Sequence, residues 1–332
     1  GTRATETYSM QQQTTVAGPS PEAFAGSGLG NRFRRAFFAT RPKFFTASVL
    51  PVVVGTALGA KAAGELAWLP ALLAVIATVL VHAAANVLND VGDDMTGADA
   101  PNTGRIYPFT GGSRFIQAGI LTREEMRRLG IGLLVASAIP GLALVAIAGP
   151  MVIWLGLAGI AIGTLYSVPS VYLSGKGVGE LAVAVAFGPL PVMGAAWLQD
   201  GIFDLGRFFV SVPVGLWVGA ILLINEVPDR VSDAAAGKRT QVVRLGIGGT
   251  KALYIGMHAL ALAGGVAAIA VGVLPWWYAL PAAALFAMGL KAGLGIADVA
   301  DKRDQVQKSI EMTLAVQALG SIAVILTVAF GG

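Results

Sequence analysis

Long apolar runs separated by short polar segments make up most of this chain. A helix that crosses the hydrocarbon core of a bilayer needs roughly 20 mostly apolar residues. Nine runs approach that length and predict nine membrane-spanning helices, so the expected fold is an all-α, polytopic membrane protein. The predicted spans are residues 46–63, 67–89, 129–148, 151–169, 178–198, 208–227, 252–274, 276–296 and 309–330.

The polar segments divide the rest of the chain. Residues 1–30 are rich in Gly, Ser, Thr, Gln and Pro, which predicts a disordered tail. Residues 31–45 mix basic side chains with phenylalanines, as expected of an amphipathic helix at the membrane interface. Within the spanning domain, 46–330, the longest hydrophilic stretches are about 95–128 and 230–251, and we expect them to cap a cavity.

Composition and charge support a membrane location. The chain is 55% hydrophobic and 13% charged, whereas about a quarter of residues are charged in soluble domains. If the nine spans begin with a cytoplasmic N-terminus, only Lys61 and Arg207 of the 23 basic residues lie on the outer side of the membrane. The positive-inside rule therefore predicts a cytoplasmic N-terminus, cytoplasmic caps and an external C-terminus. The expected membrane is the plasma membrane. The net charge of +4 then indicates anionic lipid or substrate rather than nucleic acid, and the lack of cysteine excludes thiol chemistry.

One polar pattern occurs twice. Asn86, Asp90 and Asp94 follow the spacing Asn-x3-Asp-x3-Asp, and the same spacing recurs 139 residues later. Residues four apart lie on one helix face, so each copy is expected to stack an amide and two carboxylates. The repeat predicts two four-helix halves, with a ninth helix completing a ring around a central cavity. The second copy is Asn225, Asp229 and Asp233.

These carboxylates predict a Mg²⁺ site, because Mg²⁺ prefers carboxylate, water and phosphate oxygens. A lone Asp at a helix end is more often a solvated cap, but two copies in register are not explained that way. Asp93 could share the first face, Asn86 and Asn225 could hydrogen-bond or ligate, and Glu226 lies off the stripe. The predicted metal ligands are Asp90, Asp93, Asp94, Asp229 and Asp233.

Other polar residues near the motifs have two interpretations. Arg114 and Lys238 lie in Gly-rich caps where backbone N–H groups could help to hold phosphate, although the positive-inside rule alone places basic residues there. The same applies to Arg105, Arg239 and Arg244. His82, one turn before Asn86, is either a base or hydrogen-bond donor or a buried structural histidine. Tyr166 and Tyr172, at the end of the fourth span, could steady an oxygen or a cation.

The sequence resembles the UbiA superfamily of intramembrane aromatic prenyltransferases from about Arg41 to the last span. The two Asp-rich motifs carry this resemblance. Several further segments resemble the branch that prenylates 1,4-dihydroxy-2-naphthoate for menaquinone: those that begin Arg41-Pro-Lys, Gly111-Gly-Ser-Arg, Gly177-Val-Gly-Glu, Phe187-Gly-Pro-Leu and Gly237-Lys-Arg-Thr.

The resemblance implies a Mg²⁺-dependent transfer of a polyprenyl group from a diphosphate to an aromatic acceptor. Asp90, Asp94, Asp229 and Asp233 would act in catalysis through the metal, and Tyr166 would shield an allylic cation. Implied substrate-binding residues are Asn86, Asn225, Arg41, Arg114, Lys176, Lys238 and Arg239. Two alternatives stay open: another acceptor such as homogentisate or 4-hydroxybenzoate, or a cation-coupled transporter, which the position of the motifs at span ends disfavours.

Overall fold

A computed structural model describes residues 18–97, 102–167, 173 and 176–331, and all regular structure within them is helical. The prediction of an all-α protein is confirmed. The α-helices are α2 Leu29–Ala39, α3 Thr46–Ala63, α4 Trp68–Thr96, α5 Arg123–Ala148, α6 Met151–Ser167, α7 Gly179–Phe187, α8 Pro189–Asp200, α9 Leu205–Asn225, α10 Arg230–Ala235, α11 Gln241–Ala270, α12 Ala279–Leu294 and α13 Val299–Phe330; 3₁₀ turns are η1 Pro21–Phe24, η2 Pro42–Phe44 and η4 Trp276–Tyr278.

Among the described residues, 8 helical segments are long and apolar enough to cross a membrane. They coincide with eight of the predicted spans. The remaining predicted span, 151–169, coincides with α6, a shorter apolar helix. An integral membrane protein is therefore supported, while the count of nine spans and the closed ring stay predictions.

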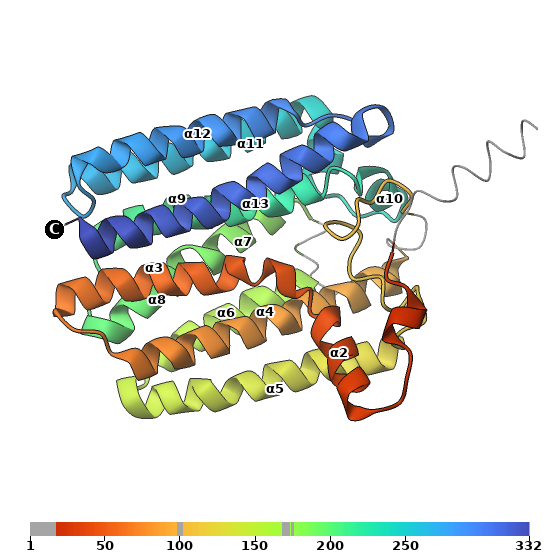
Figure 1. The fold of residues 1–332 in the computed structure, drawn as a ribbon, viewed down its shortest axis with the longest axis horizontal. Coiled ribbons are helices and arrows are strands. Elements are labelled where there is room, and N and C mark those ends of the chain that lie inside the picture. The colour runs from red at the N-terminus through yellow and green to blue at the C-terminus, as the bar shows by residue number, and fades with distance from the viewer. Residues whose placement is uncertain (1–17, 98–101, 168–172, 174–175, 332) are drawn as a thin grey trace, which may run out of the picture.

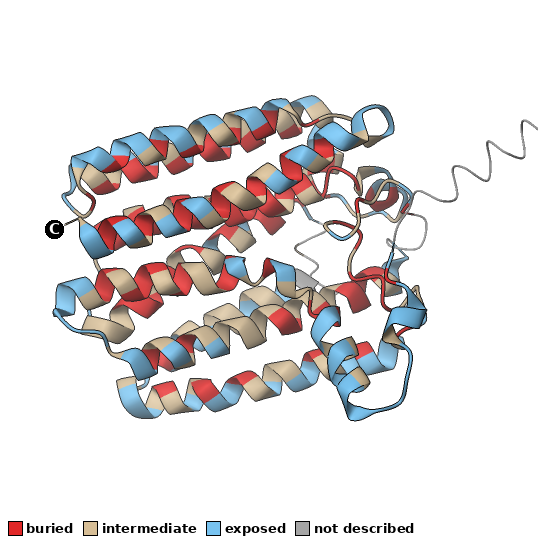
Figure 2. Ribbon diagram, in the orientation of Figure 1, coloured by how far each residue is buried: buried red, intermediate tan, exposed pale blue. Residues whose placement is uncertain are grey.

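The helices lie side by side along one bundle (Figure 1). The short helices α2 and α10 and the polar loop before α5 gather at one end, and the C-terminus lies at the other. Buried residues follow the faces that the helices turn toward their neighbours, and exposed residues follow the outer faces (Figure 2). Of the membrane-length helices, α9 has the largest buried share, so it forms the centre of the packing.

Glycines allow the closest helix contacts. A Cβ added to Gly55 of α3 would lie 2.1 Å from the carbonyl oxygen of Val192 in α8, and one added to Gly59 would lie 2.3 Å from that of Ala196. Small residues of this kind let membrane helices approach closely where no hydrophobic driving force acts between them. The contact brings α3, which carries Ser48, against the second half of the chain.

The apolar run 178–198 is not one continuous helix. It breaks at Gly188 into α7 and α8, which a hydropathy profile does not reveal. Pro189 begins α8 and has no N–H to continue the helical ladder. Gly188 also packs closely on α9, since an added Cβ would lie 2.6 Å from the Cα of Gly215.

The segment predicted as one interfacial helix, 31–45, is interrupted in the structure. Helix α2 ends at Ala39, and Arg41 adopts a left-handed φ of 59° immediately before Pro42. Proline disfavours the α conformation in the preceding residue, which accounts for the end of the helix. Phe33 is 71% exposed on α2, and the interfacial location of this helix stays a prediction.

Contacts of the N-terminal segment tie it to the first cap. Phe24, in η1, packs edge-on against Phe38 of α2 at 5.8 Å and Phe115 of the cap at 4.9 Å between ring centroids. This turn falls within the segment predicted as a disordered tail, whose residues 1–17 lie outside the described residues. Aromatic contacts therefore fix part of that segment.

The N-terminus of α5 is set by a capping box. The Thr122 side chain accepts from the Glu125 N–H, and Glu125 accepts from the Thr122 N–H. This arrangement satisfies two backbone donors and starts the helix ahead of its apolar part, which begins near residue 129. As a result, Arg123 lies at the end of the bundle that holds the acidic motifs.

Candidate active site

The first acidic motif lies on α4, which is unbroken through Asp94. Asp93 is buried and accepts hydrogen bonds from Lys238 at 3.0 Å and from Asn89 at 3.0 Å. Its neighbour Asp94 instead accepts from Arg123 at 2.6 Å. Successive helical residues project about 100° apart, so α4 directs Asp93 toward the second motif and Asp94 toward α5.

The second motif spans a break. Asn225 is the last residue of α9, a turn follows, and α10 carries Asp233. Pro228 lies in the turn and cannot donate to a helical ladder. The Asp233 N–H still donates to the Asp229 carbonyl at 2.8 Å, so these two carboxylates are one turn apart. The expected single helix face therefore holds for Asp229 and Asp233 but does not extend to Asn225.

The first cap contacts both motifs. Asn102 donates to one oxygen of Asp229 at 2.6 Å, and the Gly111 N–H donates to the other at 3.0 Å. The Ser113 N–H donates to Asp90 at 2.9 Å. Backbone and amide donors stabilise carboxylates that are removed from water. This loop therefore positions carboxylates from both halves of the chain.

Lys238, from the second cap, links the motifs directly. Its ammonium lies 3.0 Å from Asp93 and 3.9 Å from Asp233, and these three side chains are only 11%, 9% and 6% exposed. One positive charge thus lies within ion-pair distance of carboxylates that are far apart in sequence. Asp93, beside the first motif, thus lies across Lys238 from Asp233 of the second motif.

Burial shifts the pKa of the carboxylates in the second motif upward. Burial raises the pKa of Asp233 to about 7 although Lys238 acts in the opposite direction. Burial likewise raises the pKa of Asp229, although the hydrogen bonds from Asn102 and Gly111 act in the opposite direction. Desolvation disfavours the charged form of a carboxyl group, and a nearby cation favours it. The site would therefore be stabilised by an additional cation.

The donor atoms fit Mg²⁺. One buried oxygen each of Asp90, Asn89 and Asn225 has no hydrogen-bond partner among the described residues, which is costly unless a ligand contacts it. Across the described residues, no three acidic or histidine side chains form a metal-binding group. Mg²⁺ usually takes one or two protein carboxylates and completes its shell with water and phosphate oxygens. The arrangement suits an ion that protein and diphosphate hold together.

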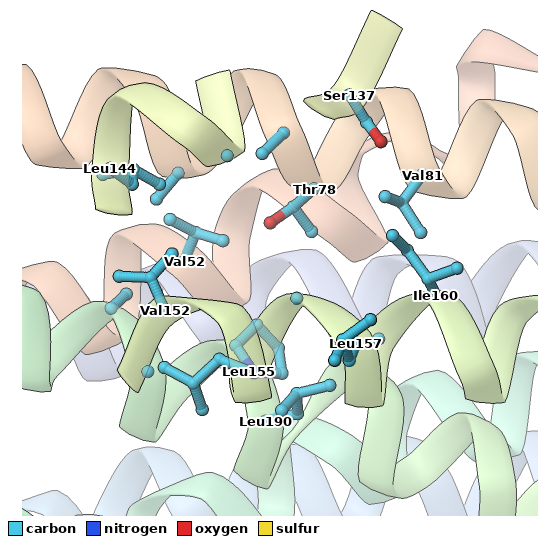
Figure 3. Close-up of a pocket in the computed structure, with 18 of the residues that line it drawn as sticks. Val52, Thr78, Val81, Ser137, Leu144, Val152, Leu155, Leu157, Ile160 and Leu190 are labelled. Atoms are coloured by element: carbon cyan, nitrogen blue, oxygen red, sulfur yellow. The ribbon is translucent and has the colours of Figure 1, made fainter. Parts of the chain in front are cut away.

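Two cavities meet beside the motifs. The smaller cavity, of ≈ 150 Å³, has a mainly apolar wall that also carries polar side chains, and it is named the polar cavity for these: Arg41, His82, Asn86, Asn89 and Asn225. An apolar cavity of ≈ 360 Å³ lies between α4, α5, α6 and α8, with side chains such as Leu144, Leu155 and Ile160 in its wall (Figure 3). Both cavities are bordered by the same five residues, here named the neck: His82, Ala85, Gly163, Ala186 and Phe187.

Residues 48–316 match the model of the UbiA prenyltransferase family. The chain belongs to this family. It is 38% identical over 212 residues to 1,4-dihydroxy-2-naphthoate octaprenyltransferase of Escherichia coli (strain K12), and the aligned region covers 62% of this chain and 67% of that protein. It is 33% identical to the protein of the same name from Mycobacterium tuberculosis (strain ATCC 25618 / H37Rv), over 71% and 77% of the two chains.

Solved structures show the same fold. A UbiA homolog from Aeropyrum pernix K1 has a TM-score of 0.63 at 20% identity, covering 85% of this chain and 97% of that one. A UbiA homolog from Archaeoglobus fulgidus, bound to DMAPP and Mg²⁺, has a TM-score of 0.62 at 15% identity over 86% and 99%. The predicted resemblance to UbiA prenyltransferases, and to the dihydroxynaphthoate branch, is confirmed by the family and the named relatives, so the chain is a prenyltransferase.

Within this UbiA protein, the other predicted site residues lie in different surroundings. Arg41 donates to the Phe109 carbonyl at 3.4 Å and lies over the Phe44 ring. Asn86 donates to the Thr40 carbonyl at 3.0 Å and borders the polar cavity. Arg114 is buried with a left-handed φ of 65°. These three are close to the motifs or their caps.

Lys176 and Arg239 are exposed, and within the described residues neither forms an ion pair with the site carboxylates. Tyr166 belongs to α6, but its side chain lies outside what is described, as does all of Tyr172. Their predicted roles stay predictions.

Sequence reasoning missed Asn89, Asn102 and Ser113. Asn89 directly precedes Asp90 and lies four residues before Asp93, so the same spacing argument, shifted by three residues, selects it. Asn102 and Ser113 belong to an irregular loop: Asn102 acts across the two halves on Asp229, and the Ser113 N–H contacts Asp90 of its own half. No spacing pattern identifies such contacts.

Proposed function

We propose that this protein transfers a polyprenyl group from a prenyl diphosphate to 1,4-dihydroxy-2-naphthoate, with Mg²⁺ as cofactor. The observation that carries the proposal is the facing of Asp93 and Asp233 across Lys238, beside a polar cavity that continues into an apolar one. The relatives named for dihydroxynaphthoate prenylation support this acceptor. Homogentisate and 4-hydroxybenzoate are the competing acceptors.

The acidic residues would hold the metal. Asp93 and Asp233, supported by Asp90 and Asp229, are its proposed ligands, and Asn89 and Asn225 offer unpaired amide oxygens beside them. Bound Mg²⁺ supplies Lewis-acid stabilisation of the charge that grows on a diphosphate leaving group. Lys238 would then contact diphosphate oxygens, since its ammonium already lies among the carboxylates.

The apolar cavity would hold the prenyl chain and exclude water from the reacting carbon. The allylic C–O bond breaks with its electron pair leaving on the diphosphate, and the acceptor supplies the pair for the new C–C bond from the ring carbon that bears its carboxylate. Loss of the acceptor carboxylate as CO₂ restores the aromatic ring. Tyr166 is proposed to shield the developing allylic cation.

We further propose nine spans in a ring, with the N-terminus and both caps cytoplasmic, the C-terminus outside and α2 at the plasma-membrane interface. The distribution of basic residues supports this orientation. Tagging the two termini and testing their accessibility in intact cells checks it. An accessible N-terminus outside the cell would contradict it.

The direct functional test combines the purified protein with geranylgeranyl diphosphate, Mg²⁺ and each of the three acceptors. Mass spectrometry of the product should show prenylated, decarboxylated dihydroxynaphthoate, and Asp93→Asn should abolish it. A dominant homogentisate or 4-hydroxybenzoate product would contradict the acceptor assignment. Mg²⁺-independent turnover would contradict the metal site.

A further inference from the structure

His82 lies at the meeting point of the two cavities. It belongs to α4, seven residues before Asn89, and is one of the five neck residues. The rings of Phe187 and Phe45 form T-shaped contacts with its ring, with centroids 4.9 and 5.8 Å away. The imidazole is therefore fixed by its neighbours where the polar cavity becomes apolar.

Among the described residues, one ring nitrogen of His82 has a hydrogen-bond partner. Nδ1 pairs with the Ser48 hydroxyl of α3, and in the described part of the chain no hydrogen bond to Nε2 is found. Nε2 is thus available to a molecule in the neck. A polar atom that loses water without gaining a partner is unfavourable, so a ligand that pairs with it is bound selectively.

The chemistry of Nε2 discriminates among the three groups that could reach the neck. A prenyl chain offers no hydrogen bond, and diphosphate oxygens only accept. A hydroxyl group both donates and accepts, so it pairs with Nε2 in either imidazole tautomer that the Ser48 contact permits. The two phenylalanine rings also suit an aromatic ring.

We propose that His82 binds a ring hydroxyl of the aromatic acceptor and thereby positions the acceptor against the prenyl carbon at the neck. The inference rests on the proposed prenyl transfer. A hydroxyl that donates to Nε2 gains electron density on its ring, which favours attack on an electrophilic carbon. His82 would then determine selectivity for hydroxylated acceptors rather than binding of the diphosphate.

The chain offers a matched control in its second histidine. His258 is 2% exposed in α11, neither of its ring nitrogens has a hydrogen-bond partner, and it packs on Gly289 rather than on either of the two cavities. A general effect of replacing a buried histidine should appear in His258→Gln. An effect on the acceptor should appear only at His82.

The experiment measures KM for each substrate in wild type, His82→Leu, His82→Gln and His258→Gln, using geranylgeranyl diphosphate with 1,4-dihydroxy-2-naphthoate or its analogue that lacks the 4-hydroxyl. His82→Leu should raise the acceptor KM roughly 3–10-fold, the effect of one hydrogen bond. It should leave unchanged the KM for geranylgeranyl diphosphate and the Mg²⁺-dependent thermal shift with inorganic pyrophosphate. His82→Gln should restore most of the acceptor affinity.

If the 4-hydroxyl is the partner of His82, wild type and His82→Leu should have similar KM values for the analogue. If His82→Leu still raises the KM for the analogue, the 1-hydroxyl is the partner, which also supports the inference. An unchanged acceptor KM in an active, folded His82→Leu protein would overturn the His82 assignment alone. A raised KM for the prenyl diphosphate would overturn it in favour of a prenyl-chain contact. If the wild type transferred no prenyl group to any acceptor, both the proposed function and this inference would fall.

Discussion

The two acidic motifs share one spacing in sequence but have different backbones. The first lies on the unbroken helix α4, and the second passes from the end of α9 through a turn into α10. On α4, Asp93 rather than Asp94 meets the second motif, whereas Asp229 and Asp233 remain one turn apart after the break. The matching spacing of Asp94 and Asp233 therefore does not give them matching positions.

The difference shows how the chain brings the motifs together. Because α4 is unbroken, only one narrow stripe of its surface faces the centre of the bundle. Asp94 lies beside that stripe and forms an ion pair with Arg123 instead. The break at Pro228 frees α10 and the following cap to bring Asp233 and Lys238 across to Asp93. The caps then complete the site by binding the carboxylate of the opposite half.

The largest expected effect separates adjacent aspartates. Asp93→Asn should reduce Mg²⁺-dependent diphosphate release at least about 100-fold, because a charge that stabilises the leaving group is lost. Asp94→Asn should reduce the rate of diphosphate release only a few-fold, since the ion pair between Asp94 and the 56% exposed Arg123 contributes about 1 kcal/mol or less. Steady-state assays of both variants measure this contrast. Equal losses would assign Asp94 to the metal site.

A second contrast compares adjacent basic residues. Lys238→Met should destabilise the Mg²⁺-free protein by about 3 kcal/mol or more, because it leaves buried carboxylates without their counter-charge. Adding Mg²⁺ should recover part of this stability. Arg239→Met, at an exposed neighbour, is the control and should change stability little. Thermal unfolding in detergent with and without Mg²⁺ measures both; identical curves for the two variants would contradict the role of Lys238.

A smaller effect tests the first cap. Asn102→Ala removes a 2.6 Å hydrogen bond to Asp229 while the Gly111 N–H donor remains. The free energy of unfolding should therefore fall by about 1.5–3 kcal/mol. The loss should appear as a weaker Mg²⁺-dependent thermal shift. Thr103→Ala, at the adjacent exposed residue, is the control. An unchanged shift in Asn102→Ala would show that this cap does not organise the metal ligands.

Sequence alone predicted the architecture better than the register of the site. Bilayer thickness sets span length, so apolar runs located eight membrane-length helices, but hydropathy is blind to the break at Gly188, which depends on contact with Gly215. The residue types of the site followed from the repeated Asp spacing. The spacing does not show which of Asp93 and Asp94 faces the second motif, because both lie near the predicted stripe; in the structure their contacts with Lys238 and Arg123 distinguish them.

The central claim is that one metal-bound diphosphate needs both motifs at once. The most direct measurement is the affinity of a non-hydrolysable geranylgeranyl thiolodiphosphate, with Mg²⁺, for wild type, Asp93→Asn, Asp233→Asn and the double variant. Residues that act as a unit give non-additive losses. We predict that each single variant loses most of the Mg²⁺-dependent affinity and that the double variant loses little more. Additive losses, or full affinity in either single variant, would contradict the account.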